Sequence, residues 1–254
     1  MEKEASLQET YDSNANAYSQ FLQTPLGTLE QQLFDLCITD CTDFHVLDLG
    51  GGIGLRAHNA LEAGARTVDV VDISPEMMRQ GQQAFSTSIH REKITWHQGD
   101  ASKSLRHLDL GPYDLVIADG IFDHAGTIEE LEAMWSNTAA YLKPGGRVVA
   151  NRNSPYSRAA ADGKYGVTFT DFQTLPGGAG ISYRYRMATD PPLVFQSMGL
   201  ETYYSGSTEI PGKFFEDFQN VSWEETPIVK ADPAFWRLYL QDPILYISTA
   251  RKRS

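Results

Sequence analysis

The chain has 254 residues, 41% of them hydrophobic, and a formal net charge of −12. The apolar fraction excludes wholesale disorder, and the length allows one or two domains. The negative charge repels phosphate backbones, so we expect no nucleic-acid partner. No apolar run approaches the ~18 residues of a membrane span, and the N-terminus lacks the apolar stretch of a signal peptide, so we expect a cytoplasmic protein that binds no membrane.

The cysteines point to neither a disulfide framework nor a metal site. Cys37 and Cys41 are the two cysteines of the chain and stand four residues apart on a predicted helix. No further cysteine or histidine completes a metal-binding spacing around them. We interpret both as free core cysteines and expect no metal.

Strand and helix patterns alternate through the first 150 residues. Apolar runs predict strands over 44–49, 67–72, 93–98, 113–118 and 147–150, with helices between them. Helix starts are marked by Ser74-Pro75 and by Thr127, which stands three residues before Glu130 in a capping-box pattern. Strands that alternate with helices predict a parallel sheet of the doubly wound, Rossmann-like α/β class.

The alternation of strand and helix patterns ends after residue 150. Residues 167–172 and 181–185 predict a hairpin, and 191–198 predict a short helix. The last two strands of the sheet are expected over 200–204 and 245–249. We expect a single domain over 1–254, whose parts are an N-terminal helical lid in 1–36, a ligand-binding core in 44–150, a hairpin insertion in 151–190 and an aromatic-rich insertion in 211–243.

The most informative segment runs over 46–54 and contains the pattern G-x-G-x-G at Gly50, Gly52 and Gly54. Glycines between a strand and a helix let a ligand approach the backbone, and the helix N-terminus supplies unpaired N–H groups. A dinucleotide-binding loop has its third glycine one residue later, where this chain has Leu55. The match to an NAD site is therefore imperfect.

Carboxylates follow the next three predicted strands. Asp72 ends the second strand, where a carboxylate can accept hydrogen bonds from both hydroxyls of a ribose. Asp100 follows the third strand and can accept from an exocyclic amine such as that of adenine, and Asp119 ends the fourth strand. These side chains share the carboxyl edge of one sheet, where open α/β folds bind ligands.

Five segments carry a resemblance to a known family. In chain order they read VLDLGGGIG, VDVVDIS, GDA, YDLVIADGIFDHA and LKPGG, within residues 44–150. Their order and spacing resemble those of the class I S-adenosylmethionine-dependent methyltransferases. The resemblance implies a seven-stranded sheet whose last strand is antiparallel, S-adenosyl-L-methionine as cofactor and S-adenosyl-L-homocysteine as its product.

The resemblance also implies roles for single residues. The implied contacts are Gly50 and Gly52 with the methionine portion, Asp72 with the ribose, Ile73, Asp100 and Ala101 with adenine, and Asp119 beside the sulfonium. Asp48 either touches the ligand or orients the glycine loop.

The acceptor side is marked by His124. Relatives that methylate small molecules often carry a histidine at this distance after the fourth strand, and the histidine pKa near 6.5 suits proton removal at neutral pH. We predict His124 as the catalytic base, with the neighbouring Asp123 as a weaker candidate. The alternative is that His124 packs beside the cofactor or caps the next helix.

Residues 11–18 resemble the Y-D-x-x-A-x-x-Y opening of many small-molecule methyltransferases. The resemblance suggests a lid in which Tyr18 contacts the cofactor and Tyr11 the acceptor; the alternative is a flexible arm. Aromatic residues between 183 and 236 either line a pocket for a planar acceptor or form a core. We predict Arg152, Tyr183 and Trp236 as further acceptor contacts.

Together these features predict methyl transfer to a small molecule, with an aromatic N or O nucleophile of a secondary metabolite as acceptor. The segment 151–185 is loosely similar to enzymes of the toxoflavin N-methyltransferase type. An alternative is carboxyl methylation of a small organic acid, for which Arg152, Arg184 and Arg186 are available as cationic anchors. A second alternative is a cofactor-binding protein of the same fold without methyl transfer. Either a monomer or a homodimer is expected.

Overall fold

A computed structural model describes residues 20–253, and every structural statement below concerns this part of the chain. The predicted lid residues Tyr11 and Tyr18 lie outside it. No helix within 20–253 combines the length and the apolar character needed to cross a bilayer.

A seven-stranded sheet forms the centre of the molecule, in the order β3-β2-β1-β4-β5-β10-β9. Its strands are β1 (His45–Leu49), β2 (Thr67–Asp72), β3 (Ile94–Gln98), β4 (Tyr113–Ala118), β5 (Leu142–Asn153), β9 (Phe215–Asn220) and β10 (Leu245–Lys252). The first five strands run parallel, and β10 is antiparallel to β5 and to β9. This confirms the predicted sheet with its antiparallel last strand.

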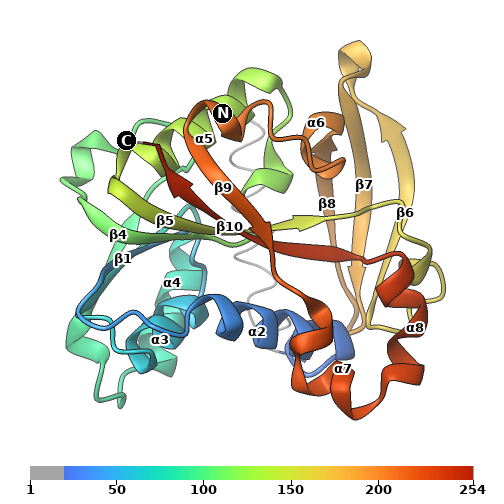
Figure 1. The fold of residues 1–254 in the computed structure, drawn as a ribbon, viewed down its shortest axis with the longest axis horizontal. Coiled ribbons are helices and arrows are strands. Elements are labelled where there is room, and N and C mark those ends of the chain that lie inside the picture. Colours follow the sequence, from blue (N-terminus) through green and yellow to red (C-terminus); the bar gives the residue numbers. More distant parts are fainter. Residues whose placement is uncertain (1–19, 254) are drawn as a thin grey trace.

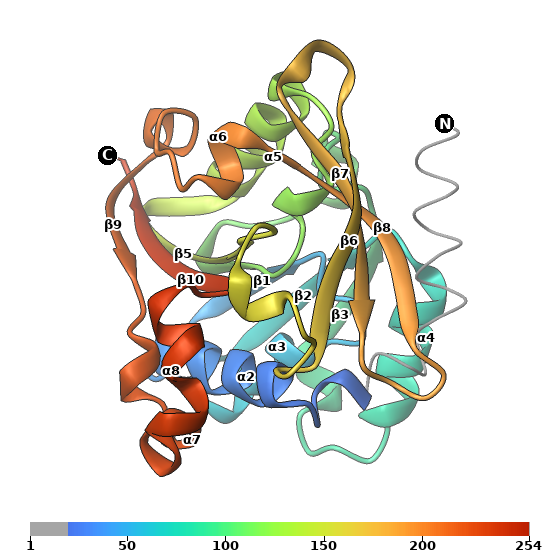
Figure 2. The same cartoon turned by 90° about the vertical axis from the view of Figure 1, so that its right-hand side faces the viewer.

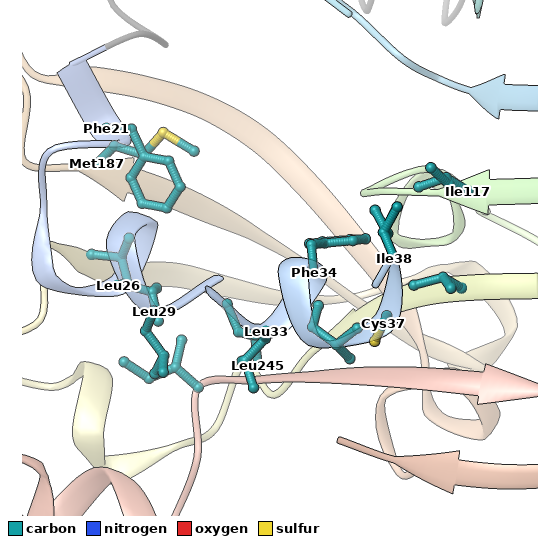
Figure 3. Close-up of a cluster of buried hydrophobic side chains, with 14 of the residues drawn as sticks. Phe21, Leu26, Leu29, Leu33, Phe34, Cys37, Ile38, Ile117, Met187 and Leu245 are labelled. Carbon is teal, nitrogen blue, oxygen red and sulfur yellow. The ribbon is translucent and has the colours of Figure 1, made fainter. Parts of the chain in front are cut away.

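Helices cover both faces of this sheet (Figure 1). The helices are α2 (Pro25–Cys37), α3 (Leu55–Glu62), α4 (Pro75–Ala84), α5 (Ile128–Ala140), α6 (Glu201–Tyr204), α7 (Pro227–Ala231) and α8 (Pro233–Gln241). Side chains alternate between the faces: Val46 of β1 packs in the core under α2, whereas Leu47 packs in the core under α5. Figure 3 shows the apolar side of α2 in the first of these cores, in one cluster with Leu245 of β10.

The predicted helix caps form. Ser74 accepts a hydrogen bond from the Met77 amide at the start of α4, and Thr127 accepts one from the Glu130 amide at the start of α5. The Glu130 carboxylate reaches back to the amide of Gly126, one residue before the cap. Each cap satisfies amides that the first helical turn leaves unpaired.

A second, three-stranded sheet stands beside the first (Figure 2). Its antiparallel strands are β6 (Val167–Thr174), β7 (Gly180–Met187) and β8 (Leu193–Leu200). The first two form the predicted hairpin. The third replaces the predicted helix over 191–198, which was wrong: residues 193–200 all pair with β7, and this tertiary pairing outweighs the local pattern.

The prediction of a sheet strand over 200–204 was also wrong. These residues form α6, and the turn buries Tyr203 against the α5 side of the sheet, where its hydroxyl donates to the Asn151 carbonyl oxygen. The missing sheet strand is β9, which lies inside the stretch 211–243 that was predicted as an insertion. That stretch therefore completes the main sheet and also supplies α7 and α8.

Candidate functional site

A pocket lies at the carboxyl edge of the main sheet. Residues at the carboxyl ends of β1 to β5 line it, together with Leu245, the first residue of β10. Leu245 pairs with Asn153 at the end of β5, because β10 is antiparallel to β5. The lining residues are Phe21, Glu30, Asp48, Gly50, Gly51, Gly52, Ile53, Leu55, Arg56, Asp72, Ile73, Met77, Gly99, Asp100, Ala101, Asp119, Gly120, Ile121, Asp123, His124, Met134, Asn151, Asn153, Tyr185, Met187, Phe195, Ser197 and Leu245.

The glycine loop between β1 and α3 forms one wall. Gly50 has a φ of +74°, which side chains rarely adopt, and a Cβ built on it would stand 2.1 Å from Cγ2 of Ile121. At Gly51 a Cβ would stand 2.6 Å from the Asp48 carboxylate. Glycine is therefore required at both positions because neighbouring atoms fill the space of a side chain.

Asp72 ties this loop to the start of α4. One carboxylate oxygen accepts a hydrogen bond from the Gly52 amide at 2.7 Å, and the other accepts one from the Ser74 amide at 2.8 Å. The residue is 8% exposed and lines the pocket, so its carboxylate is held in a fixed position on the pocket wall.

Asp100 and Ala101 stand at the end of β3. One oxygen of Asp100 accepts hydrogen bonds from the Ser102 amide at 2.8 Å and the Ser102 hydroxyl at 2.7 Å. The Ala101 carbonyl accepts one from the Asn137 side chain of α5 at 2.9 Å. These contacts fix the turn that follows β3 and leave both residues on the pocket wall.

Asp48 lies fully buried on β1, beneath the glycine loop. Its Oδ2 accepts a hydrogen bond from the Ala57 amide at 3.0 Å, whereas Oδ1 is buried without a partner among the described residues. Burial raises the pKa of Asp48 to about 7. An unpaired buried acceptor on a pocket wall is an unsatisfied group that a bound ligand or water can satisfy.

A buried charge cluster joins α2, α3 and the end of β4. The Arg56 guanidinium lies 2.9 Å from the Asp119 carboxylate and 3.4 Å from the Glu30 carboxylate. Burial, and then the negative charge of Asp119, raise the pKa of Glu30 to about 8. Arg56 is therefore already shared between two acids.

The other half of the pocket is built around Asp123, on a short 3₁₀ turn (Phe122–His124) after β4. Asp123 is 3% exposed, and its carboxylate accepts a hydrogen bond from the Asn153 side-chain amide at 2.7 Å. Burial raises the pKa of Asp123 to about 7. His124 lines the same wall.

The second sheet covers this half. Tyr185 and Met187 of β7 and Phe195 and Ser197 of β8 line the pocket, together with Phe21, which precedes α2. The carboxyl edge of the main sheet is thus closed by strands that come from a later part of the chain (Figure 2).

The structure brings most of the predicted site residues into this single pocket. Its walls contain Asp48, Gly50, Gly52, Asp72, Ile73, Asp100, Ala101, Asp119 and His124. Their binding roles stay predictions.

Three predicted acceptor contacts do not line the pocket. Arg152 donates a hydrogen bond to the Tyr204 carbonyl at 2.5 Å and stacks over Tyr246. Tyr183 is 1% exposed in the core of the second sheet, and Trp236 is stacked on Tyr165 beneath that sheet. Each of the three side chains packs elsewhere: Arg152 against Tyr204 and Tyr246, Tyr183 among aromatic residues of the second sheet, and Trp236 against Tyr165.

Sequence reasoning missed Arg56, Glu30, Asn151 and Asn153. Arg56 offered a signal: a cation in the first turn of a helix opposes the helix dipole and needs a partner. Asn151 and Asn153 offered another, since residues two apart at a strand end share one face. Their hydrogen-bond partners come from distant segments of the chain, so the sequence could not predict which residues pair.

Comparisons with known proteins agree with this geometry. Residues 46–146 match a family described as a methyltransferase domain. The ribosomal protein L11 methyltransferase of Burkholderia multivorans is 31% identical over 103 residues, which are 41% of this chain and 30% of that protein. The chain spans less than a third of the curated relatives it matches.

Solved structures share the fold. The CcbJ methyltransferase from Streptomyces caelestis matches with a TM-score of 0.61 and 16% identity, over 89% of each chain. The glycopeptide N-methyltransferase MtfA, solved with S-adenosyl-L-homocysteine, matches with a TM-score of 0.56 and 16% identity, over 89% of this chain and 90% of that one. At such identities the likeness is one of fold.

Proposed function

This chain contains a class I S-adenosylmethionine-dependent methyltransferase domain, as its sequence predicted, and on that premise we propose that it transfers the methyl group of S-adenosyl-L-methionine to a small-molecule acceptor. The observation that carries the proposal is one continuous pocket, which joins the glycine loop of β1 to a covered second half under β7 and β8. The first half suits the cofactor and the second the acceptor.

The residues of the first half fit the cofactor. Gly50 and Gly52 line the pocket without side chains of their own, and Asp48 offers an unpaired carboxylate oxygen. We assign Gly50 and Gly52 to the methionine portion, Asp72 to the ribose, Ile73, Asp100 and Ala101 to adenine, and Asp119 to the region of the sulfonium. Bound there, the cofactor would supply a methyl group on a positively charged sulfur, which suits a pocket lined by carboxylates.

The second half suits a small acceptor. Its walls combine apolar side chains, Phe195 and Met187, with the polar groups of Asp123, His124 and Asn151. Apolar walls exclude water from methyl transfer, and a few fixed polar groups orient the nucleophile. We propose a nitrogen or oxygen nucleophile of a secondary metabolite, with His124 among the residues that contact it.

Carboxyl methylation has no support from this site. Arg152 is engaged with Tyr204 and Tyr246 outside the pocket, and Arg184 lies exposed beside Asp171 on the second sheet. Within the described residues, the pocket wall offers an acidic acceptor no free cationic anchor, because Arg56 is held between two acids.

Calorimetric titration of S-adenosyl-L-methionine tests the proposal. We expect binding in the micromolar range, about −8 kcal/mol, and a loss of about 100-fold in Asp72→Ala. Asp171→Asn is the matched control, because it removes an exposed carboxylate from β6, far along the chain from the glycine loop. Wild-type protein that binds neither S-adenosyl-L-methionine nor S-adenosyl-L-homocysteine would contradict the proposal.

Transfer itself needs a second measurement. Labelled methyl from S-adenosyl-L-methionine should appear in a small molecule when the protein is incubated with a metabolite extract. Cofactor binding without any such transfer would favour a cofactor-binding protein that does no methylation.

A further inference from the structure

The acceptor half of the pocket carries a buried carboxylate that the cofactor assignments leave unused. Asp123 is 3% exposed and faces the pocket from the turn after β4. The Asn153 side chain donates to it at 2.7 Å, and the Asn153 backbone amide donates as well. Two donors from one residue fix the direction of the carboxylate.

The charge of the pocket wall favours a cationic ligand. Its described residues include six carboxyl groups, those of Glu30, Asp48, Asp72, Asp100, Asp119 and Asp123, against one arginine, Arg56. Burial raises the pKa of Glu30, Asp48 and Asp123, so only part of this set is ionised at neutral pH. Arg56 is paired with Glu30 and Asp119 and is therefore not available to an anionic acceptor, whereas a protonated amine can pair with the ionised carboxylate of Asp123.

Resting on the proposed methyl transfer, we propose that the Asp123 carboxylate, held by Asn153, selects an amine as the acceptor and takes the proton that the amine must lose before it is methylated. An ammonium nitrogen has no free electron pair and cannot attack a methyl group. In the transfer, an N–H bond breaks, an O–H bond forms on Asp123, and the electron pair stays on nitrogen. The nitrogen then forms the N–C bond as the carbon–sulfur pair leaves with sulfur, and the nitrogen is cationic again.

The surroundings of Asp123 are suited to this exchange. The polar and charged groups packed around it are Asn153 and Arg152 of β5, Asp119 after β4, Tyr203 of α6, Ser197 of β8 and the adjacent His124. Burial raises the pKa of Asp123 to about 7, although its hydrogen bonds and Arg152 act in the opposite direction. A carboxylate with a raised pKa holds a proton better than an exposed aspartate does, so it is suited to take one from an amine.

Binding of matched probes tests the proposal without knowledge of the natural acceptor. The protein, saturated with S-adenosyl-L-homocysteine, is titrated at about pH 8 with 3-phenylpropylamine, 3-phenylpropanol and 3-phenylpropanoate. We expect the amine to bind at least about tenfold tighter than the alcohol, and the carboxylate most weakly. Asp123→Asn should bring the amine to the affinity of the alcohol, whereas Asp171→Asn, which removes an exposed carboxylate, should leave the preference intact.

The pH dependence separates Asp123 from His124. The amine probe stays protonated below about pH 9, so its affinity follows the ionisation of the carboxylate and should rise about tenfold from pH ~6 to pH ~8. The rise should persist in His124→Asn and vanish in Asp123→Asn. Protonation of a histidine would also weaken cation binding at low pH. If the rise in amine affinity with pH vanished in His124→Asn, the assignment of the proton acceptor to Asp123 would therefore be contradicted.

The outcomes distinguish this inference from the proposed function. Wild-type protein that fails to bind S-adenosyl-L-homocysteine overturns the proposed function. Wild-type protein that binds it, yet prefers the alcohol or the carboxylate or shows no preference, overturns only the assignment of Asp123. If Asp123→Asn does not fold, the wild-type preference and its pH dependence decide the question.

Discussion

The two halves of the pocket are held together in different ways. In the cofactor half, carboxylates accept hydrogen bonds from the backbone close by in sequence: Asp72 from the Ser74 amide and Asp100 from the Ser102 amide. In the acceptor half, Asp123 depends on Asn153, which is 30 residues away, and on the cover of β8, which lies further along the chain. The first half combines such local bonds with longer ones, such as the bond from the Gly52 amide to Asp72, whereas the wall around Asp123 is assembled from distant segments.

This difference explains which half can vary. The wall around Asp123 takes its side chains from the turn Phe122–His124, from β5 and from β8, so a change in any one of these segments alters it.

The charge cluster around Arg56 also joins distant segments, because the partners of Arg56 lie on α2 and after β4. We expect Arg56→Leu to lower the free energy of unfolding by about 3–5 kcal/mol, since Glu30 and Asp119 would stay buried without their cation. Chemical denaturation at about pH 8 measures this. Arg66→Leu is the control: its ion pair with Asp43 is exposed, so its loss should cost under about 1 kcal/mol. Equal effects of the two changes would show that the cluster contributes no more than a surface pair.

The glycine loop tests how far local encoding reaches. Gly50→Ala and Gly145→Ala both place a side chain at positive φ, but a Cβ at Gly50 meets Ile121 whereas one at Gly145 meets nothing within 4 Å. We expect Gly50→Ala to lower the free energy of unfolding by about 2 kcal/mol more than Gly145→Ala does. This difference reflects overpacking alone, because both variants share the strain of a positive φ. Cofactor binding, measured by calorimetry, should weaken only in Gly50→Ala. Equal losses in both variants would mean that backbone strain, and not the close approach to Ile121, fixes the loop.

The smallest expected effect concerns pH. A buried carboxyl group with a raised pKa binds its proton more tightly in the folded than in the unfolded state, so stability falls as pH rises from about 4 to about 7. Asp48 and Asp123, each with a pKa raised to about 7 by burial, act in this direction. We expect the ligand-free protein to be less stable at pH ~8 than at pH ~5, and Asp48→Asn to reduce that difference by about 1 kcal/mol.

Thermal unfolding at both pH values measures this effect. Asp171→Asn again serves as the control, because its carboxylate is 58% exposed. A pH dependence that is unchanged in Asp48→Asn would mean that the Asp48 carboxyl titrates alike in the folded and unfolded states.

The sequence predicted the parts of the fold whose causes are local. Strand β1, the glycine turn and the caps at Ser74 and Thr127 each follow from residues within a few positions of one another. Strand β8 and helix α6 were predicted in the wrong conformation, because partners on β7 and β5 decide between helix and strand there. A short segment has no means of signalling a partner that is distant in the chain.

Periodic hydrophobicity and glycine spacing by themselves predicted the parallel strands with helices between them and the carboxyl edge as the place for a ligand, and the resemblance of five segments to class I methyltransferases added the antiparallel last strand. Only the tertiary structure decided that Arg152, Tyr183 and Trp236 lie outside the pocket and that Asn153 holds Asp123 inside it. The physical reason is that burial and side-chain pairing between distant segments are properties of the packed molecule. A residue type can suggest such a pair, but only the folded chain brings its members within hydrogen-bond distance.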